Sequence, residues 1–149
     1  MGPVWFIEGS AEYMALVGLL NSGVQEKGNM GGKNQFYPLE YMRRKIEGGI
    51  IGLNSVCPGV SLQNIDYGNS CTNVAYELGA WAHAYLANKF GPNILLDTFY
   101  PNLEKLGWEG AFERAYGMSS EEFYKDFKMF LNLPLNEQLS ILPKSFKAN

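Results

Sequence analysis

"PVWFIEGSAEYMALVGLL", residues 3–20, predicts a helix over 4–21, with Pro3 near the first turn, where a missing backbone N–H costs nothing. Two carboxylates, Glu8 and Glu12, lie one turn apart on this helix. The rest of their face is lined by small and apolar side chains, namely Trp5, Ala11, Ala15, Leu16 and Leu19. A carboxylate on an apolar face is costly to bury unless a partner pairs with it. We therefore expect a partner for Glu8 elsewhere in the fold.

Further helices are predicted along the rest of the chain, and no segment shows the period-two alternation of a full strand. Glycine, proline and capping residues set their ends. The predicted helices are 37–49 with Gly48 and Gly49 at its end, 72–90 with Thr72 as N-cap and Gly91 as stop, 92–107 opened by Pro92, 108–117, and 119–133 with Ser119 and Glu122 at capping-box spacing.

The predicted fold class is therefore all-α, a helical bundle with two long irregular loops at 21–35 and 50–71. The 149 residues suit one helical domain over 1–149 with a real hydrophobic core. Long loops inside a compact domain are usually functional or disordered. These two flank the helix at 37–49 and could form one wall of a cleft.

The composition excludes some classes of function. Hydrophobic residues make up 46% and charged residues 18%, which is typical of a globular chain. A net charge of −3 argues against nucleic-acid binding, which needs a dense basic surface. The one basic cluster, "MRRK" at 42–45, is interpreted as a solvated helix face. No apolar run approaches membrane-spanning length, so no membrane partner is expected.

Cys57 and Cys71 lie in a segment rich in Gly, Pro, Asn and Ser. They either form a disulfide or remain two small apolar side chains. We favour the disulfide, which would staple a loop of a length worth about 3 kcal/mol in the chain-entropy model. A disulfide in turn favours an oxidising compartment, so an extracytoplasmic or secreted location is expected.

The motif "WFIEGSAEY" resembles the third-ligand helix of gluzincin zinc peptidases, the superfamily of thermolysin and the aminopeptidase N-like enzymes. The resemblance implies that Glu8 stands at the position of the third zinc ligand. It also implies that Glu12 stands where several members keep a carboxylate that orients a metal-bound imidazole. Zinc is then the implied cofactor, and a peptide is the implied substrate.

A second motif, "YELGAWAHAYLANKFG" at 76–91, resembles a downstream helix of the same superfamily. In the aminopeptidase-like branch its tyrosine donates a hydrogen bond to the developing oxyanion. The resemblance carries this catalytic role to Tyr76. The segment "WEGAFERAYGMSSEEFYKDFKMFL" also looks like the helical end of these domains.

One departure from the family pattern is decisive for activity. Gluzincins need H-E-x-x-H, and this chain has a single histidine, His83. Either the chain is the C-terminal part of a larger peptidase domain whose motif precedes Met1, or it is a remnant that lost its metal. We favour the first, and expect the chain alone to lack peptidase activity and to bind zinc weakly or not at all. The alternative function is a non-catalytic helical module that binds peptide or protein.

Each candidate residue also has an ordinary structural explanation. Glu8 can serve a helix N-terminus, where negative charge is favourable, and Glu12 can be a solvated or paired surface carboxylate. Tyr76 can be a core tyrosine with its hydroxyl at the rim, and His83 is expected to be packed rather than a ligand. The family interpretation requires Glu8 and Tyr76 to face one cleft within about two helical turns, or roughly 11 Å.

The face of the first helix has no N-terminal partner in this chain. Exposed apolar patches tend to be covered by association, so a homodimer that uses this helix is expected.

Overall fold

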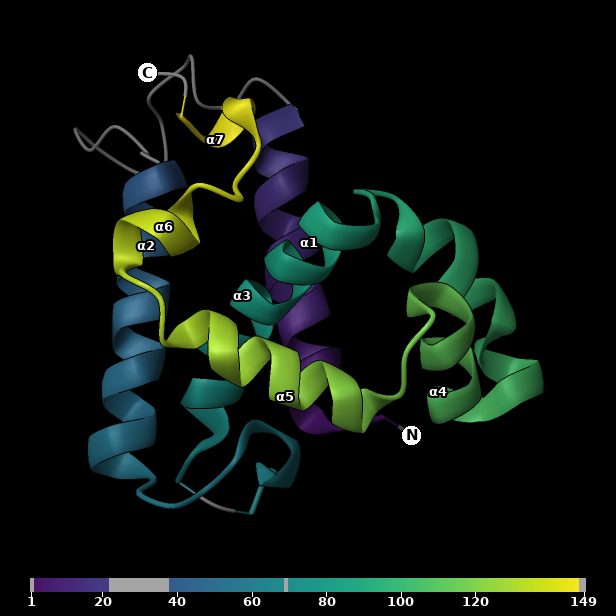
Figure 1. The fold of residues 1–149 in the computed structure, drawn as a ribbon, viewed down its shortest axis with the longest axis horizontal. Coiled ribbons are helices and arrows are strands. Elements are labelled where there is room, and N and C mark those ends of the chain that lie inside the picture. The colour runs from purple at the N-terminus through teal and green to yellow at the C-terminus, as the bar shows by residue number, and fades with distance from the viewer. Residues whose placement is uncertain (1, 22–37, 69, 148–149) are drawn as a thin grey trace.

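The computed structural model describes residues 2–21, 38–68 and 70–147 (Figure 1). Over these ranges the chain is helical and has no strand, so the all-α prediction is confirmed. Figure 1 shows α5 running across the bundle between α2 and α4. The α-helices are α1 (Val4–Asn21), α2 (Pro38–Ile51), α3 (Thr72–Phe90), α4 (Tyr100–Tyr116), α5 (Ser120–Leu131), α6 (Leu135–Leu139) and α7 (Lys144–Lys147).

Helices α1 and α3 pack side by side, and their backbones touch at two glycines. A Cβ atom on Gly9 would lie 2.2 Å from the carbonyl carbon of Gly79, and a Cβ atom on Gly79 would lie 2.3 Å from the carbonyl oxygen of Trp5. Real Cβ atoms do not approach other heavy atoms so closely, because packed atoms stay about 3.5 Å or more apart. Glycine at both positions therefore sets the distance between these helices, and with it the distance between the side chains along their seam.

Helix α2 does not end where the sequence predicts. Gly48 and Gly49 lie inside α2, which continues to Ile51 and then into a π-helical turn, η2, over Gly52–Val56. A Cβ atom on Gly49 would lie 2.5 Å from Leu78 Cγ on α3. The prediction was wrong because these glycines let α2 approach α3 closely, and that packing outweighs their low helix propensity.

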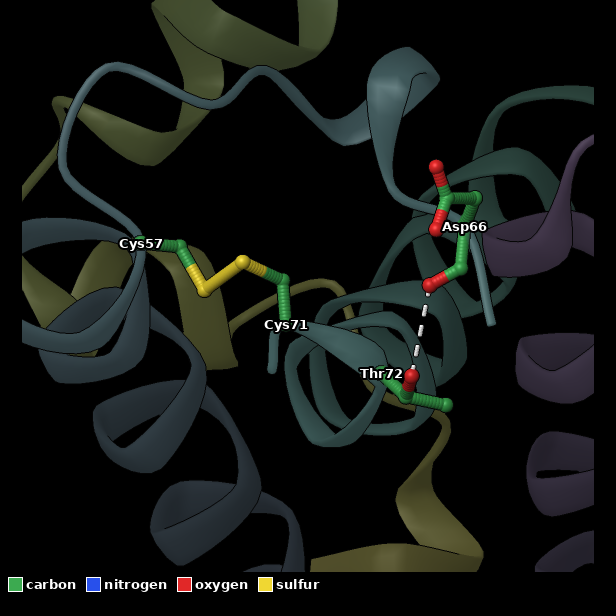
Figure 2. The surroundings of a disulfide bond; sticks show 4 residues. All are labelled: Cys57, Asp66, Cys71 and Thr72. Carbon is green, nitrogen blue, oxygen red and sulfur yellow. Dashed lines mark hydrogen bonds between the residues drawn. A yellow bond between two sulfur atoms is a disulfide. The ribbon is translucent and has the colours of Figure 1, made fainter. Parts of the chain in front are cut away.

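The segment between η2 and α3 is a loop closed by a disulfide. Cys57 and Cys71 are joined, with 5.8 Å between their Cα atoms, and both are buried (Figure 2). A short 3-10 helix, η3, covers Leu62–Asn64 within the loop. Most of the other predicted loop, 21–35, lies outside the described residues.

Thr72 does not cap α3 as predicted. The N-cap residue of α3 is Cys71, and no side chain makes a capping hydrogen bond there. The Thr72 hydroxyl donates instead to the backbone oxygen of Asp66 at 3.3 Å, which ties the loop to the start of the helix (Figure 2). Gly91 ends α3 with a φ of 111°, as the sequence predicts.

The predicted helix over 92–107 begins later than expected. A turn after Pro92 leads into a π-helical segment, η4 (Leu95–Phe99), and then into α4. Helix α4 is kinked at Gly107, where φ is 69° and ψ is 179°, so the predicted break between 92–107 and 108–117 is present. The capping box of Ser119 and Glu122 at the start of α5 is also confirmed.

Aromatic side chains build the core around Trp5, which is 0% exposed. Its ring stacks on Phe123 of α5 with 5.3 Å between ring centroids, and its Nε1 donates to the Tyr124 hydroxyl at 2.9 Å. The start of α1 is therefore anchored on α5. These aromatic side chains are buried in the core or half-buried against it: Phe90, Phe99, Trp108, Phe112, Phe123 and Phe127.

Among the helices that the structure describes, we find none with the combination of length and apolar character that crossing a bilayer requires.

Candidate functional site

Glu8 lies at the seam of α1 and α3, where two tyrosine hydroxyls reach its carboxylate. The Tyr67 hydroxyl donates to Glu8 Oε1 at 2.5 Å. The hydroxyl of Tyr76, one helical turn before Gly79, also interacts with the Glu8 carboxylate. The sequence-based expectation that Glu8 has a partner and faces Tyr76 is thus met.

The carboxylate controls the ionisation of both phenols. The hydrogen bond to Glu8 raises the pKa of Tyr67 above its ordinary value, and the same cause raises the pKa of Tyr76. The reason is that a phenolate would lose the hydrogen bond and face the negative charge of Glu8. An ordinary tyrosine is already protonated at neutral pH, so both hydroxyls are available there as donors.

Glu12 is paired with Lys45 of α2. The Lys45 ammonium lies 2.7 Å from Glu12 Oε2, and its side chain is only 13% exposed. Burial lowers the pKa of Lys45, but the hydrogen bond to Glu12 and the charges of Tyr41 and Glu12 outweigh burial and raise it overall. In this chain Glu12 is therefore a paired carboxylate, which is one of the interpretations considered from the sequence.

A third carboxylate, Glu77, lies beside this ion pair. Burial raises the pKa of Glu77, and the charge of Lys45 partly opposes that rise. A Cβ atom on Gly48 would lie 2.9 Å from Glu77 Oε2, so glycine on α2 leaves room for the carboxylate. Lys45 is thus the cation around which carboxylates from α1 and α3 gather.

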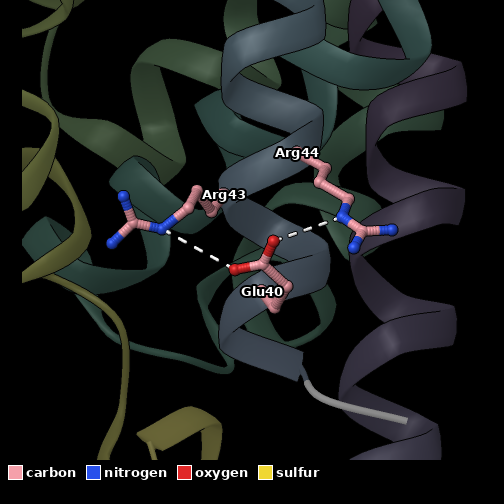
Figure 3. A network of polar contacts seen from close by, with 3 residues as sticks. All are labelled: Glu40, Arg43 and Arg44. Carbon is pink, nitrogen blue, oxygen red and sulfur yellow. Dashed lines mark hydrogen bonds and ion pairs between the residues drawn. The ribbon is translucent and has the colours of Figure 1, made fainter.

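The remaining basic residues of 42–45 are neutralised within their own helix. Arg43 and Arg44 lie 3.9 Å and 3.2 Å from the two carboxylate oxygens of Glu40 (Figure 3). Both arginines are well exposed, so these pairs contribute little to stability. For Arg43 and Arg44, the interpretation of 42–45 as a solvated helix face agrees with the structure.

His83 is packed in the core, away from Glu8. It is 3% exposed, and its Nε2 lies 3.0 Å from the backbone oxygen of Phe6. The side chains of Phe6 and Glu8 point about 160° apart around α1. The His83 ring packs against the Phe6 ring with 4.6 Å between centroids, so it lies on the Phe6 side of the helix. Burial lowers the pKa of His83 to about 4, so the imidazole is neutral and donates from Nε2.

The described residues contain no group of three or more His, Cys, Asp or Glu side chains that could hold a metal ion. A tetrahedral zinc site takes three or four protein ligands, whereas the seam offers the carboxylate of Glu8 and two protonated phenols. Zinc therefore does not fit a site built from these residues alone.

A groove of about 650 Å³ lies between α1 and the η4–α4 segment. Its walls are mostly apolar, with Ile7 and Ala11 on one side and Leu103 and Trp108 on the other. The hydroxyls of Ser10 and Tyr100, 3.3 Å apart, add a polar point to the wall. Such a groove has the size and character of a binding pocket.

The face of α1 that carries Glu8 and Glu12 spans the boundary between core and solvent. Trp5 and Leu16 are buried, whereas Ala11 and Ala15 are exposed. The apolar stripe expected to lack a partner is therefore partly covered within the chain.

Sequence reasoning missed Tyr67 and Lys45. Tyr67 lies in an irregular loop where no periodicity marks a residue as facing the site. Lys45 lies in a run of basic residues, and nothing in that run distinguishes it from its solvated neighbours. The unexplained Glu12 was the available signal, because a carboxylate on an apolar face needs a cation from another helix.

Comparison of the chain with protein-family models, with curated proteins and with solved structures finds no match.

Proposed function

We propose that this chain is the C-terminal helical portion of a gluzincin-like zinc-dependent peptidase, inactive alone because H-E-x-x-H is absent from it. In this proposal Glu8 is the third zinc ligand and Tyr76 the donor to the developing oxyanion. Two histidines and a general base would come from sequence outside these 149 residues.

One observation carries the proposal. Glu8 and Tyr76 stand far apart in sequence, yet the hydroxyl of one reaches the carboxylate of the other across the α1–α3 seam. In a helical bundle of another kind these two side chains would have no reason to face the same point. The close crossing at Gly9 and Gly79 fixes their separation.

Tyr76 has the protonation state that its proposed role needs. Its hydroxyl is protonated at neutral pH, as in an ordinary tyrosine, and the neighbouring Glu8 raises its pKa further. A positioned O–H can donate to negative charge that develops on a substrate carbonyl oxygen, and one such donor is worth about 100-fold or more in rate.

A second candidate is a non-catalytic helical module that binds peptide or protein. The observation that favours it is that the carboxylates of the seam are already satisfied: Glu8 by two hydroxyls and Glu12 by Lys45. A network of this kind needs no metal to be stable. The groove beside α1 would then be the binding surface.

The test uses the full protein encoded by the reading frame that contains this chain. Its bound zinc and its chelator-sensitive peptidase activity are measured for the wild type, Glu8→Gln and Tyr76→Phe. The matched control is Tyr85→Phe, which removes a hydroxyl from the same helix, at a ring that packs among Phe127 and Phe130 of α5.

The peptidase proposal expects Glu8→Gln to lose stoichiometric zinc. It expects Tyr76→Phe to keep zinc and to lose about 100-fold or more in kcat, with Tyr85→Phe near wild type. A full protein that holds no zinc, or equal activity of the two Tyr→Phe variants, would contradict it and leave the binding module.

A further inference from the structure

The loop that carries Tyr67 is fixed at both ends and in its middle. The Cys57–Cys71 disulfide closes it, and the side chains of Leu62 and Ile65 are buried in the core. Tyr67 lies in the exposed part of the loop that follows Ile65.

A turn in this segment aims Tyr67 at the seam. The backbone N–H of Gly68 donates to Asp66 Oδ1 at 2.7 Å, and the backbone oxygen of Asp66 accepts from Thr72 at the start of α3 (Figure 2). Tyr67 therefore stands between two residues whose positions are fixed by hydrogen bonds. The loop, rather than burial of the ring, places its hydroxyl.

Tyr67 is 58% exposed, so it belongs to the surface and not to the core. Its hydroxyl nevertheless makes a short hydrogen bond to Glu8 Oε1. Tyr76 approaches the same carboxylate from α3, the scaffold side, whereas Tyr67 approaches from the loop side. The Tyr67 hydroxyl thus occupies one acceptor site of Oε1 that a ligand arriving from solvent would otherwise use.

We propose that Tyr67 is a cap, held by the disulfide loop, which covers the Glu8 carboxylate and regulates access to it. Removal of the cap exposes Oε1 to a metal ion or another electrophile while the bond from Tyr76 remains. The statement that a metal ion would bind the uncovered Glu8 rests on the proposed function. The statement that Tyr67 covers Glu8 does not.

The test measures the reactivity of Glu8 in the 149-residue chain and needs neither metal nor peptidase activity. The folded protein is treated with a water-soluble carbodiimide and glycine ethyl ester. Modification of the Glu8 peptide is then quantified by mass spectrometry. The variants are Tyr67→Phe, which removes only the hydroxyl, and the double variant Cys57→Ser/Cys71→Ser, which releases the loop. The control is Tyr85→Phe, a hydroxyl deletion on α3 at a ring that packs against Phe127 and Phe130 of α5.

The cap predicts that Glu8 labelling rises several-fold in Tyr67→Phe, stays at the wild-type level in Tyr85→Phe, and rises in the double variant. Glu12, protected by Lys45, is the internal reference and should keep its labelling in Tyr67→Phe. Equal labelling of Glu8 in Tyr67→Phe and wild type would overturn the cap. Increased labelling in Tyr67→Phe but not in a folded double variant would overturn the role of the disulfide.

The failure of this proposal and that of the proposed function are distinguishable. Failure of the cap proposal appears as unchanged Glu8 labelling in the Tyr67→Phe variant of this chain. Failure of the peptidase proposal appears as absent zinc or unchanged kinetics in the full protein. A phenol titration followed by ultraviolet absorbance tests the contact between Tyr67 and Glu8 independently of the labelling. The substitution Glu8→Gln should lower the pKa of the Tyr67 phenol.

Discussion

The substitution Gly79→Ala should destabilise the protein by forcing α1 and α3 apart. The new Cβ atom would lie 2.3 Å from the carbonyl oxygen of Trp5 and 2.9 Å from Gly9 Cα. Ordinary contacts of this kind need about 3.5 Å, so the two backbones must separate locally by about 1 Å. Backbone cannot yield by changing a rotamer, which places the cost at the upper end of overpacking, about 3 kcal/mol.

Alanine also favours a helix over glycine by about 1 kcal/mol, which offsets part of this cost. The expected net loss is therefore about 2 kcal/mol in the free energy of unfolding. For a domain of this size that corresponds to a fall in Tm of roughly 4 to 8 °C. Urea unfolding followed by circular dichroism measures the loss directly.

The matched control is Gly18→Ala on α1, where a Cβ atom would meet nothing within 4 Å. This variant gains helix propensity without a clash, so its stability should rise by up to about 1 kcal/mol. Equal stability of Gly79→Ala and wild type, or equal loss in both variants, would refute the argument that a backbone contact sets the seam. Separation of the helices should also weaken the bond from Tyr76 to Glu8 and lower the pKa of the Tyr76 phenol.

Four further predictions concern other parts of the chain. His83 is neutral in the fold and protonated in the unfolded chain between about pH 4 and 6.5, so the unfolded state binds more protons there. The free energy of unfolding should fall by about 3 kcal/mol as the pH drops through this window, and a proton NMR titration should show the imidazole still neutral at pH 5.5. Calorimetric titration of zinc into the 149-residue chain should detect no stoichiometric site, and a sub-micromolar site that depends on Glu8 would contradict this. Alkylation of denatured, unreduced protein should add no groups at Cys57 or Cys71, whereas two added groups would exclude the disulfide in solution. Sedimentation should show a dimer that the substitution Ala11→Glu on the exposed face of α1 dissociates, and a wild-type monomer at high micromolar concentration would rule it out.

The sequence predicts the helices well because their ends carry local signals. The capping box at Ser119 and the stop at Gly91 act within one turn, so neighbouring residues are enough to place them. Gly48 and Gly49 show where local signals fail. Glycine can end a helix, and it can also allow another helix to pack closely against it. Here α3 packs against Gly48 and Gly49, and the sequence around them does not reveal this.

The candidate site was predictable to a similar extent. A carboxylate on an apolar face calls for a partner, and the order of the two motifs pointed to Tyr76 as the residue facing Glu8. The loop partner, Tyr67, could not be predicted, because its position depends on the disulfide, the Asp66 turn and two buried anchors acting together. No short stretch of sequence contains all of these.

The disulfide has a consequence for how this surface could be changed. Its Cα atoms, 5.8 Å apart, form a fixed frame at the junction of η2 and α3. We therefore expect that a replacement segment which keeps both cysteines, Leu62 and Ile65 leaves η2 and α3 in place. The residue that covers Glu8 is thus carried by a loop, whereas Glu8 and Tyr76 are carried by helices. Grafting a different loop between the two cysteines would change what covers Glu8 and leave its contact with Tyr76 in place.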